Sequence, residues 1–230
     1  MDARGSLPKH MQISELLVRE IAAGRLADGA RLPGEREMAQ GMGVAVGTLR
    51  RALDDLTERG LLERVQGSGN YVRQSVDARS VYAFFRLERP EGGGLPTAEV
   101  ISAEAVPRPE HLPTETHEAR VLRVRRLRRL DGVAAALEEI WLDAPGAAGL
   151  ARQELSESLY LTYQERLGIA IARTEDRVGT GTLPDWGALG PAPGSIVGHV
   201  ARRGWAGGRV VEASETWFDS EAARFVSRTR

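Results

Sequence analysis

The sequence predicts an α+β protein with two domains, at residues 1–74 and 81–230, joined by a linker at residues 75–80. Three observations predict this fold class. Apolar residues recur at helical spacing through the first domain. Two short apolar runs around a Gln-Gly-Ser-Gly turn then predict a β-hairpin. In the second domain, strand-like segments and an Asp-Gly turn predict an antiparallel sheet, with one helix among the strands.

The first domain is predicted to contain three helices followed by the hairpin. The first two helices span residues 11–23 and the acidic run from Glu35 to Gly41, and the third closes at Gly60. Two short helices separated by a glycine-containing turn form a helix-turn-helix, whose second helix is built to enter a DNA major groove. The strands at 61–65 and 70–72, with their turn at 66–69, form a wing beside it.

The second domain is predicted to hold two hairpins and one helix. One hairpin joins strands 121–130 and 133–142 through Asp131-Gly132. The other joins 195–203 and 209–218 through a glycine-rich turn at 204–208. Between them, residues 158–167 have helical spacing, with Ser156 or Ser158 as the N-cap and Gly168 at the end.

The composition sets limits on function. The chain has 230 residues, with 31 Lys+Arg, 32 Asp+Glu and no cysteine, so disulfides, thiolate nucleophiles and cysteine zinc sites are excluded. No apolar run approaches the ~18 residues of a membrane helix, and we expect a cytoplasmic protein without membrane contact. Residues 1–75 carry 11 basic and 10 acidic side chains, so non-specific binding to nucleic acid should be weak.

Catalytic chemistry has little support in the sequence. Lys9 is the sole lysine, which excludes a pyridoxal-phosphate enzyme, because that cofactor forms a Schiff base with a lysine of the catalytic domain. No nucleophile–base pair and no metal-ligand cluster is apparent, and His111 and His117 lie in a loop-like stretch. We therefore expect no catalytic residue, no metal and no cofactor.

The first domain resembles the GntR family of bacterial winged-helix repressors. The resemblance covers almost all of residues 8–73, with matching strings at 32–39, 42–44, 48–53 and 60–69. It implies DNA contacts from the start of the second helix, the start of the recognition helix and the wing tip. The residues at these places are Arg36, Thr48, Arg50, Arg51, Gln66, Gly67 and Ser68.

Charge placement agrees with that assignment, because Arg36, Arg50, Arg51 and Arg64 can face phosphate while the acidic residues point elsewhere. One departure from the family pattern affects specificity. Members usually carry Ser or Thr followed by Arg at the start of the recognition helix, where this chain has Ala45 and Val46. Without that base-reading arginine, we expect an operator different from the commonest one of the family.

The second domain resembles the UTRA ligand-sensing domain of the HutC subfamily, which has a chorismate-lyase-like fold. The resemblance rests on Arg126-Leu127-Arg128, Ser158-Leu159-Tyr160 and the segment from Val211 to Asp219. In sugar-phosphate-binding members, the matching positions hold the anionic end and the polar ring of the effector. The implied effector residues are Arg126, Arg128, Glu138, Ser158, Tyr160, Glu212 and Phe218. Phe218 replaces a tyrosine, so the effector is expected to differ from that of the sugar-phosphate sensors.

These features predict a homodimeric transcription regulator, most simply a repressor, that binds a palindromic double-stranded DNA operator. Dimerisation is expected because one recognition helix reads only a half-site. A small polar or anionic metabolite such as a sugar, sugar phosphate, sugar acid or amino-acid catabolite is expected to release the DNA. Two alternatives stay open: an enzyme of chorismate-lyase-like fold fused to a DNA-binding domain, and a DNA-independent adaptor.

Overall fold

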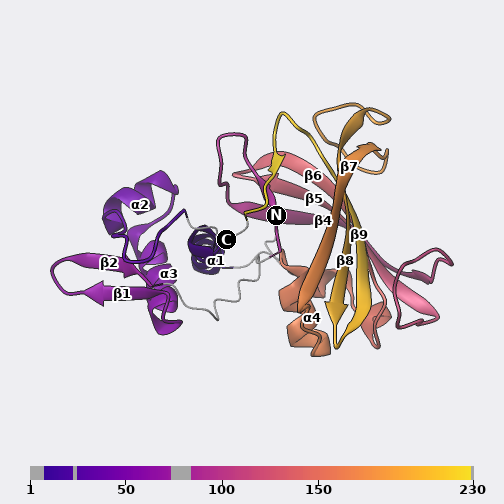
Figure 1. The fold of residues 1–230 in the computed structure, drawn as a ribbon, viewed down its shortest axis with the longest axis horizontal. Helices are drawn as coiled ribbons and strands as arrows, with labels where there is room; N and C mark the ends of the chain where they lie inside the picture. The colour runs from indigo at the N-terminus through magenta and orange to yellow at the C-terminus, as the bar shows by residue number, and fades with distance from the viewer. Residues whose placement is uncertain (1–7, 23–24, 74–83, 229–230) are drawn as a thin grey trace. The chain divides into compact units, whose positions relative to one another are not determined.

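The structure is a computed structural model that describes residues 8–22, 25–73 and 84–228. It divides into two compact units, built mainly from residues 7–85 and 86–226. Each unit has its own core (Figure 1). The predicted linker at 75–80 lies outside the described residues. Among those described, no helix is long and apolar enough to cross a membrane.

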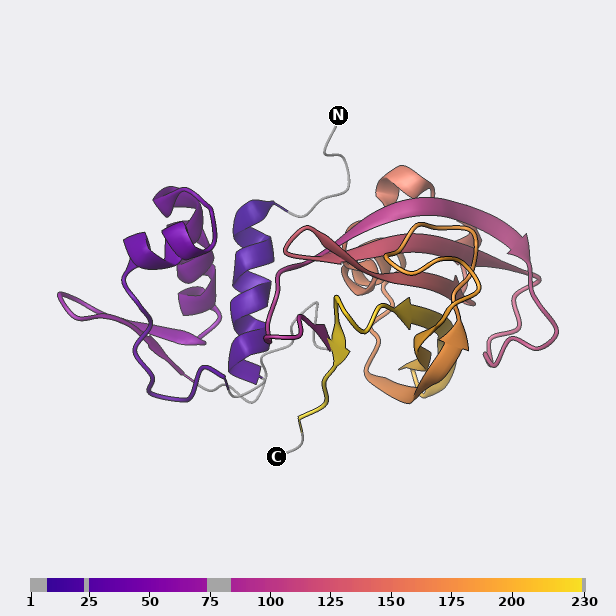
Figure 2. The same cartoon turned by 90° about the horizontal axis from the view of Figure 1, so that it is seen from above.

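The first unit contains three helices and one hairpin, in the order that the sequence predicts. The helices are α1 (Lys9–Ala22), α2 (Glu35–Gly41) and α3 (Val46–Glu58), and the strands are β1 (Leu62–Val65) and β2 (Gly69–Val72). The two strands pair antiparallel and form a narrow ribbon that projects beyond the helices (Figure 2). The helix-turn-helix and the wing are therefore both formed.

The core of the first unit depends on the amphipathic face of α3. Leu49, Leu53 and Leu56 are fully buried and pack against residues of α1 such as Ile13. Because these apolar residues recur every three or four positions, the opposite face of α3 is left to charged residues and to solvent. The helix ends at Glu58, and Gly60 follows the C-cap residue Arg59 with a φ of +71°, a left-handed conformation that suits glycine.

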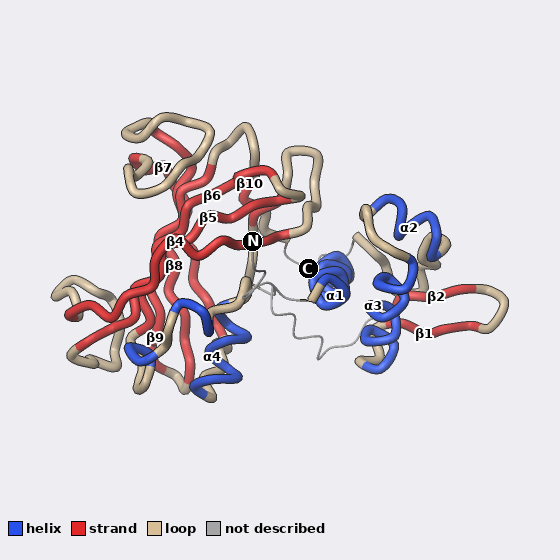
Figure 3. The backbone as a smooth tube through the Cα atoms, turned by 180° about the vertical axis from the view of Figure 1, so that it is seen from behind, coloured by secondary structure: helices blue, strands red, loops and turns tan. Residues whose placement is uncertain are grey.

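The second unit is a six-stranded antiparallel sheet with strand order β4-β5-β6-β9-β8-β7. The strands are β4 (Pro96–Pro107), β5 (Arg120–Leu130), β6 (Val133–Leu142), β7 (Arg173–Thr182), β8 (Ile196–Ala206) and β9 (Arg209–Phe218). Figure 3 shows these long strands as one curved layer with α4 (Leu159–Leu167) beside it. Smaller elements complete the unit: η1 (Ala147–Gly149), η2 (Arg152–Glu154) and the pair β3 (Leu87–Glu88) and β10 (Arg224–Phe225).

The two sheet faces are covered by different parts of the chain. Helix α4 packs on one face, where Leu159 and Tyr163 join Leu122 and Ile140 in a buried cluster. On the other face, the loops after β4 and β7 supply Leu112 and Leu183 to two separate clusters. We call these the helix-covered face and the loop-covered face.

Two β-bulges decide which residues share a face. The β5–β6 register shifts at Arg128/Arg129, so Arg126 lies opposite Glu138. The β8–β9 register shifts at Gly204/Trp205, so Gly204 lies opposite Glu212. Because side chains alternate between the faces with period two, a shift of one residue reverses the face of everything beyond it.

The structure corrects one turn predicted in the second domain and adds two strands to it. The turn predicted at 204–208 is wrong, since β8 continues to Ala206 and only Gly207 and Gly208 form the turn. Both have positive φ, at 57° and 81°, which suits a tight two-residue hairpin. The sequence prediction also omits β4 and β7, the two edge strands of the sheet.

Candidate DNA-binding surface and effector site

The residues predicted to contact DNA lie on the polar side of α2 and α3 and at the wing tip. Arg36 is in the first turn of α2, and Arg50 and Arg51 are in the first half of α3. All three are exposed. Within the described residues, Arg36 and Arg51 have no ion-pair partner, so their guanidinium groups are available to phosphate or to a base edge.

Arg50 is partly occupied by an acidic neighbour. Its Nη2 and Nε groups donate to Glu35 Oε2 at 2.7 and 3.0 Å, which joins the starts of α2 and α3. The hydrogen bond to Glu35 raises the pKa of Arg50. Arg64 is likewise paired, at 2.8 Å from Asp54. The expectation that the acids point away from these arginines is therefore wrong for both, although the pairs are exposed enough to exchange for phosphate.

The start of α3 has free backbone donors. Ala45 is the N-cap residue and makes no side-chain cap, because it has no hydrogen-bonding group. Val46 is half-buried against the core, and Thr48 is half-exposed in the first turn. The first amide groups of a helix lack intrahelical partners and favour an anion. This arrangement suits contact with the DNA backbone more than base reading.

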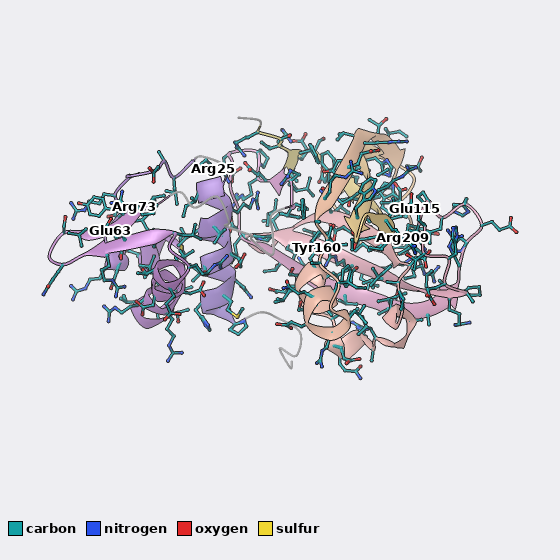
Figure 4. All side chains as sticks on the ribbon, turned by 60° about the horizontal axis from the view of Figure 1, so that its bottom comes forward. Arg25, Glu63, Arg73, Glu115, Tyr160 and Arg209 are labelled. Atoms are coloured by element: carbon teal, nitrogen blue, oxygen red, sulfur yellow. The ribbon has the colours of Figure 1, made fainter. Side chains whose placement is uncertain are left out.

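The conformation of the wing tip depends on a glycine and on one side-chain contact. Gln66 and Gly67 are exposed, and Gly67 has a φ of +76°. The hydroxyl groups of Ser68 and Tyr71 lie 2.7 Å apart, and Arg73 pairs with Glu63 at the base of the ribbon (Figure 4). The tip can therefore approach a groove with little side-chain bulk, as expected for Gln66, Gly67 and Ser68.

The residues predicted to bind the effector come together on the helix-covered face. The register places Arg126 and Arg128 of β5 beside Glu138 of β6. Glu212 and Phe218 of β9 lie on the same face, because Leu142 pairs with Glu212 and Ala136 with Phe218. Ser158 and Tyr160 come from the start of α4, which packs on this face.

Arg126 and Arg128 share one carboxylate. Both Nε groups donate to Glu138 Oε2, at 2.5 and 2.8 Å, and both Nη1 groups donate to the carbonyl oxygen of Glu157 at 3.3 Å. All three charged side chains are buried. The cluster thus has two cations and one anion, and its excess positive charge favours an anionic ligand.

Burial and ion pairing act in opposite directions on Glu138. Burial alone would raise the pKa of this carboxyl, but the nearby charges of Arg126 and Arg128 outweigh it and lower the pKa to about 2. Glu138 therefore stays ionised near neutral pH and keeps the two guanidinium groups side by side. The cost of burying these charges is offset only while all three remain paired.

Glu212 and two tyrosines form the neighbouring part of the site. Tyr160, labelled in Figure 4, donates its hydroxyl to Glu212 Oε1 at 2.8 Å. Glu212 Oε2 and the hydroxyl of Tyr163 are buried without a hydrogen bond of regular geometry among the described residues, but the two side chains interact with each other. Burial raises the pKa of Glu212, and the hydrogen bonds from Tyr160 and Tyr163 oppose the increase. A ligand hydroxyl beside them would complete their hydrogen bonding.

Ser158 and Phe218 have structural roles that are clear from their contacts. Ser158 is the N-cap of α4, as predicted, and accepts from the amide of Leu161 at 3.4 Å. Gly168 ends the helix with a φ of +66°. Phe218 lies against Gly198 of β8, where an added Cβ would be 2.2 Å from the ring. The ring therefore occupies space that only glycine leaves open.

Sequence reasoning missed Arg202 and Asp176 on this face. Arg202 of β8 pairs with Asp176 of β7 through two hydrogen bonds of 2.6 and 2.8 Å. Arg202 also interacts electrostatically with Tyr160 and Glu212. Counting back from the Gly-Gly turn would have placed Arg203 opposite Glu212, because the bulge at Gly204/Trp205 has no clear sequence signal.

Fold and sites together define a class of protein: a transcription regulator that binds DNA through a winged helix-turn-helix and a small-molecule effector through a second domain. No group of side chains in the described ranges could hold a metal ion. Residues 9–72 match the model of the gntR family of bacterial regulatory proteins, and residues 91–224 match the UTRA domain. The chain belongs to the gntR family and carries a UTRA domain.

Relatives support the same class. The chain is 54% identical to the HTH-type transcriptional regulator SmoD of Agrobacterium fabrum, over 98% of both chains. It is 32% identical to the mannosyl-D-glycerate transport/metabolism system repressor MngR of Escherichia coli, over 76% of this chain and 75% of that one. The ligand-binding domain of a GntR-family regulator from Bordetella bronchiseptica has the same fold, with a TM-score of 0.57 at 18% identity over 64% of this chain and 98% of that one. The family and its relatives are transcription regulators and not enzymes, so the chain is a DNA-binding transcription regulator.

Proposed function

We propose that the chain is a cytoplasmic, homodimeric repressor of the HutC subfamily, which leaves a palindromic operator when an anionic carbohydrate binds its UTRA domain. One observation carries the choice of effector class. Arg126 and Arg128 are buried around a single carboxylate, next to the buried polar groups of Glu212 and Tyr163, which make no hydrogen bond of regular geometry with each other. An anionic group and a hydroxyl-bearing ring would satisfy the two parts together.

The DNA contacts are assigned to α2, α3 and the wing. Arg36, Arg50 and Arg51 supply charge, while Thr48, Gln66, Gly67 and Ser68 approach the DNA with short or flexible groups. The exposure of Arg36 and Arg51 and the uncapped start of α3 support this assignment. Because Ala45 and Val46 have no guanidinium group that could read a base, the preference for one DNA sequence over another would depend more on DNA shape and on the remaining arginines.

The effector assignment includes every residue predicted from the sequence. Arg126 and Arg128 would hold the anionic group, with Ser158 at the start of α4. Glu138, Tyr160 and Glu212 would take ring hydroxyls, and Phe218 would contact an apolar edge. The name of the relative MngR refers to mannosyl-D-glycerate, which combines a sugar with an acid, and this supports an anionic carbohydrate.

Release from DNA requires that the effector bind the non-DNA conformation more tightly, since only differential affinity shifts a population. Two copies would read the two halves of a palindromic operator. The repressor sense is supported by the names of relatives such as MngR. An adaptor that acts without DNA does not fit the gntR-family match, and Arg50→Gln is expected to abolish a specific DNA complex.

A ligand panel tests the effector class. Full-length protein is melted with glucose, gluconate, glucuronate and glucose 6-phosphate at equal concentration. A ligand that binds only the folded state raises the melting temperature, by mass action. We expect an increase with at least one anionic sugar and none with glucose. Equal increases with glucose, or none with any anion, would overturn the assignment.

A further inference from the structure

The loop-covered face of the sheet contains a hollow of about 170 Å³ that the effector assignment does not use. Its floor is formed by Ala213 of β9 and Ala201 of β8, and its apolar wall by Trp141 of β6 with Leu112 and Pro113 of the loop after β4. Arg203 also lines it. We call this hollow the loop-side pocket.

The pocket is separated from the effector cluster by the sheet itself. Trp141, Ala213 and Arg203 are direct neighbours across β6, β9 and β8. The adjacent positions Leu142 and Glu212 point to the helix-covered face, because side chains alternate along a strand. Arg202 also lines the pocket, although its guanidinium pairs with Asp176. A ligand in the loop-side pocket would therefore touch none of the predicted effector side chains.

The loop that forms the wall is fixed at several points. Asp143, which is fully buried, pairs with Arg108 at 3.0 Å and accepts from the amides of His117 and Glu118 at 3.1 and 2.9 Å. Glu115, beside Arg209 in Figure 4, exchanges two hydrogen bonds with the backbone of Val210. A wall fixed in this way keeps the pocket open without a ligand, which lowers the entropic cost of binding.

The two carboxylates of the pocket lining, Glu175 and Glu215, and two of its three arginines are paired. Arg177 bonds Glu175 at 3.1 Å, and His199 bonds Glu215 at 2.6 Å. Arg203 is half-buried and has no ion-pair or hydrogen-bond partner within the part of the chain that the structure describes. Among the described residues, His111 and Arg203 are thus the polar side chains of the pocket lining without a partner, and of the two the guanidinium binds a carboxylate best, through two parallel hydrogen bonds.

We propose that the loop-side pocket is a second small-molecule site, which takes a small monocarboxylate with a flat apolar body. Arg203 binds the carboxylate, and the body lies over Ala201 and Ala213 against Trp141. The small alanine side chains leave room for a ring that larger side chains would displace. The volume lies below the ~300 Å³ at which pockets for drug-sized ligands begin, so the ligand is small.

Calorimetry on the full chain tests this site, with benzoate as the probe and benzyl alcohol as its uncharged match. We expect benzoate to bind and benzyl alcohol not to bind at the same millimolar concentrations. Arg203→Gln should weaken benzoate binding at least tenfold, and Ala201→Leu should abolish it by filling the floor. Arg129→Gln is the matched control and should leave the affinity unchanged, because Arg129 is outside the pocket lining and already has a carboxylate partner in Glu99.

Two further measurements distinguish the loop-side pocket from the effector site and from a contact between copies of the chain. Tyr160→Phe alters the effector site and should leave benzoate binding unchanged. Sedimentation should be the same for the unsubstituted protein and for Ala201→Leu. Unchanged benzoate affinity in folded Arg203→Gln, loss of binding in Tyr160→Phe, or no binding to the unsubstituted protein would overturn the proposal. A changed sedimentation coefficient for Ala201→Leu would do so too, since the face would then be a contact between copies.

Discussion

Glu138 controls the buried cluster of the effector site. Its carboxylate is contacted by both Arg126 and Arg128, and each of these two arginines exposes less than 10% of its surface to solvent. Like charges so placed repel one another unless an anion lies between them. Glu138 supplies that anion, and the acid group of the proposed effector would share the two guanidinium groups with it.

Replacing Glu138 by Gln should therefore strongly destabilise the second unit. Removal of one partner of a buried ion pair costs about 3–5 kcal/mol, because the other charges stay buried. The urea midpoint at pH 7 should fall sharply. Glu104→Gln is the control: Glu104 pairs with Arg123 at 3.0 Å on the surface, and such pairs contribute only about 0–1 kcal/mol.

The same pair predicts a pH dependence. The folded pKa of Glu138 is about 2, below its ordinary value of 4.5, so its contribution is complete above pH 4.5 and is lost as the pH falls toward 2. A shift of that size corresponds to about 3 kcal/mol. The difference in urea midpoint between the unsubstituted protein and Glu138→Gln should therefore shrink from pH 6 to pH 3. A constant difference would contradict the ion pair.

Gly198 is the other residue whose identity matters at the site. Gly198→Ala should lower the melting temperature, because its Cβ would overlap the Phe218 ring and overpacking costs about 1–3 kcal/mol. Gly179→Ala on the adjacent strand is the control, since an added Cβ there meets nothing within 4 Å. If both variants melt alike, Phe218 is not held as described.

At the scale of elements, the ends of helix α4 can be predicted from the sequence more reliably than the strands of the sheet. Both ends of helix α4 could be predicted from the sequence. The Ser158 hydroxyl can accept a hydrogen bond from a free amide at the start of the helix, and Gly168 can adopt the left-handed conformation that ends it. Strands β5 and β9 could be predicted because a glycine-containing hairpin turn adjoins each of them, at Asp131-Gly132 and at Gly207-Gly208. Strand β7 has no such turn beside it, and most of its residues are exposed, as suits an edge strand.

The β-bulges explain why the site residues could be predicted from the family resemblance but not by counting residue pairs outward from a hairpin turn. From the turn at Asp131-Gly132, regular pairing would place Leu137 opposite Arg126. The bulge at Arg128/Arg129 places Glu138 there. The bulge at Gly204/Trp205 similarly places the side chain of Arg202 on the helix-covered face and that of Arg203 on the loop-covered face. Register depends on such single-residue shifts, which local sequence rarely specifies.

Helix α3 gives a prediction at the element scale. Arg51→Gln removes an exposed charge that has no partner among the described residues and should weaken DNA binding about equally across sequences. The slope of log K against log salt should fall by about 1 per copy that contacts DNA. Arg177→Gln in the other unit should leave the slope unchanged. A change in sequence preference without a change in slope would assign Arg51 to base reading.

At the scale of the whole molecule, charge balance constrains how the protein finds its operator. The chain has a formal net charge of -1, and two of the arginines predicted to face DNA are paired with acids. A strong general attraction to DNA is therefore absent. In the proposed dimer, affinity would come from a small number of specific contacts made by each copy, and an effector with a modest differential affinity would be enough to abolish it.

The measurement that tests this account most directly is DNA release by effector. A fragment selected from random DNA by the full chain is labelled, and fluorescence anisotropy is followed at fixed salt with glucose, gluconate, glucuronate and glucose 6-phosphate in turn. We predict a twofold-symmetric fragment that is released by at least one anionic sugar, retained with glucose, and no longer released when Tyr160→Phe and Arg128→Gln are combined. Binding that none of these sugars alters, or release from the double variant at the same concentration, would contradict the account.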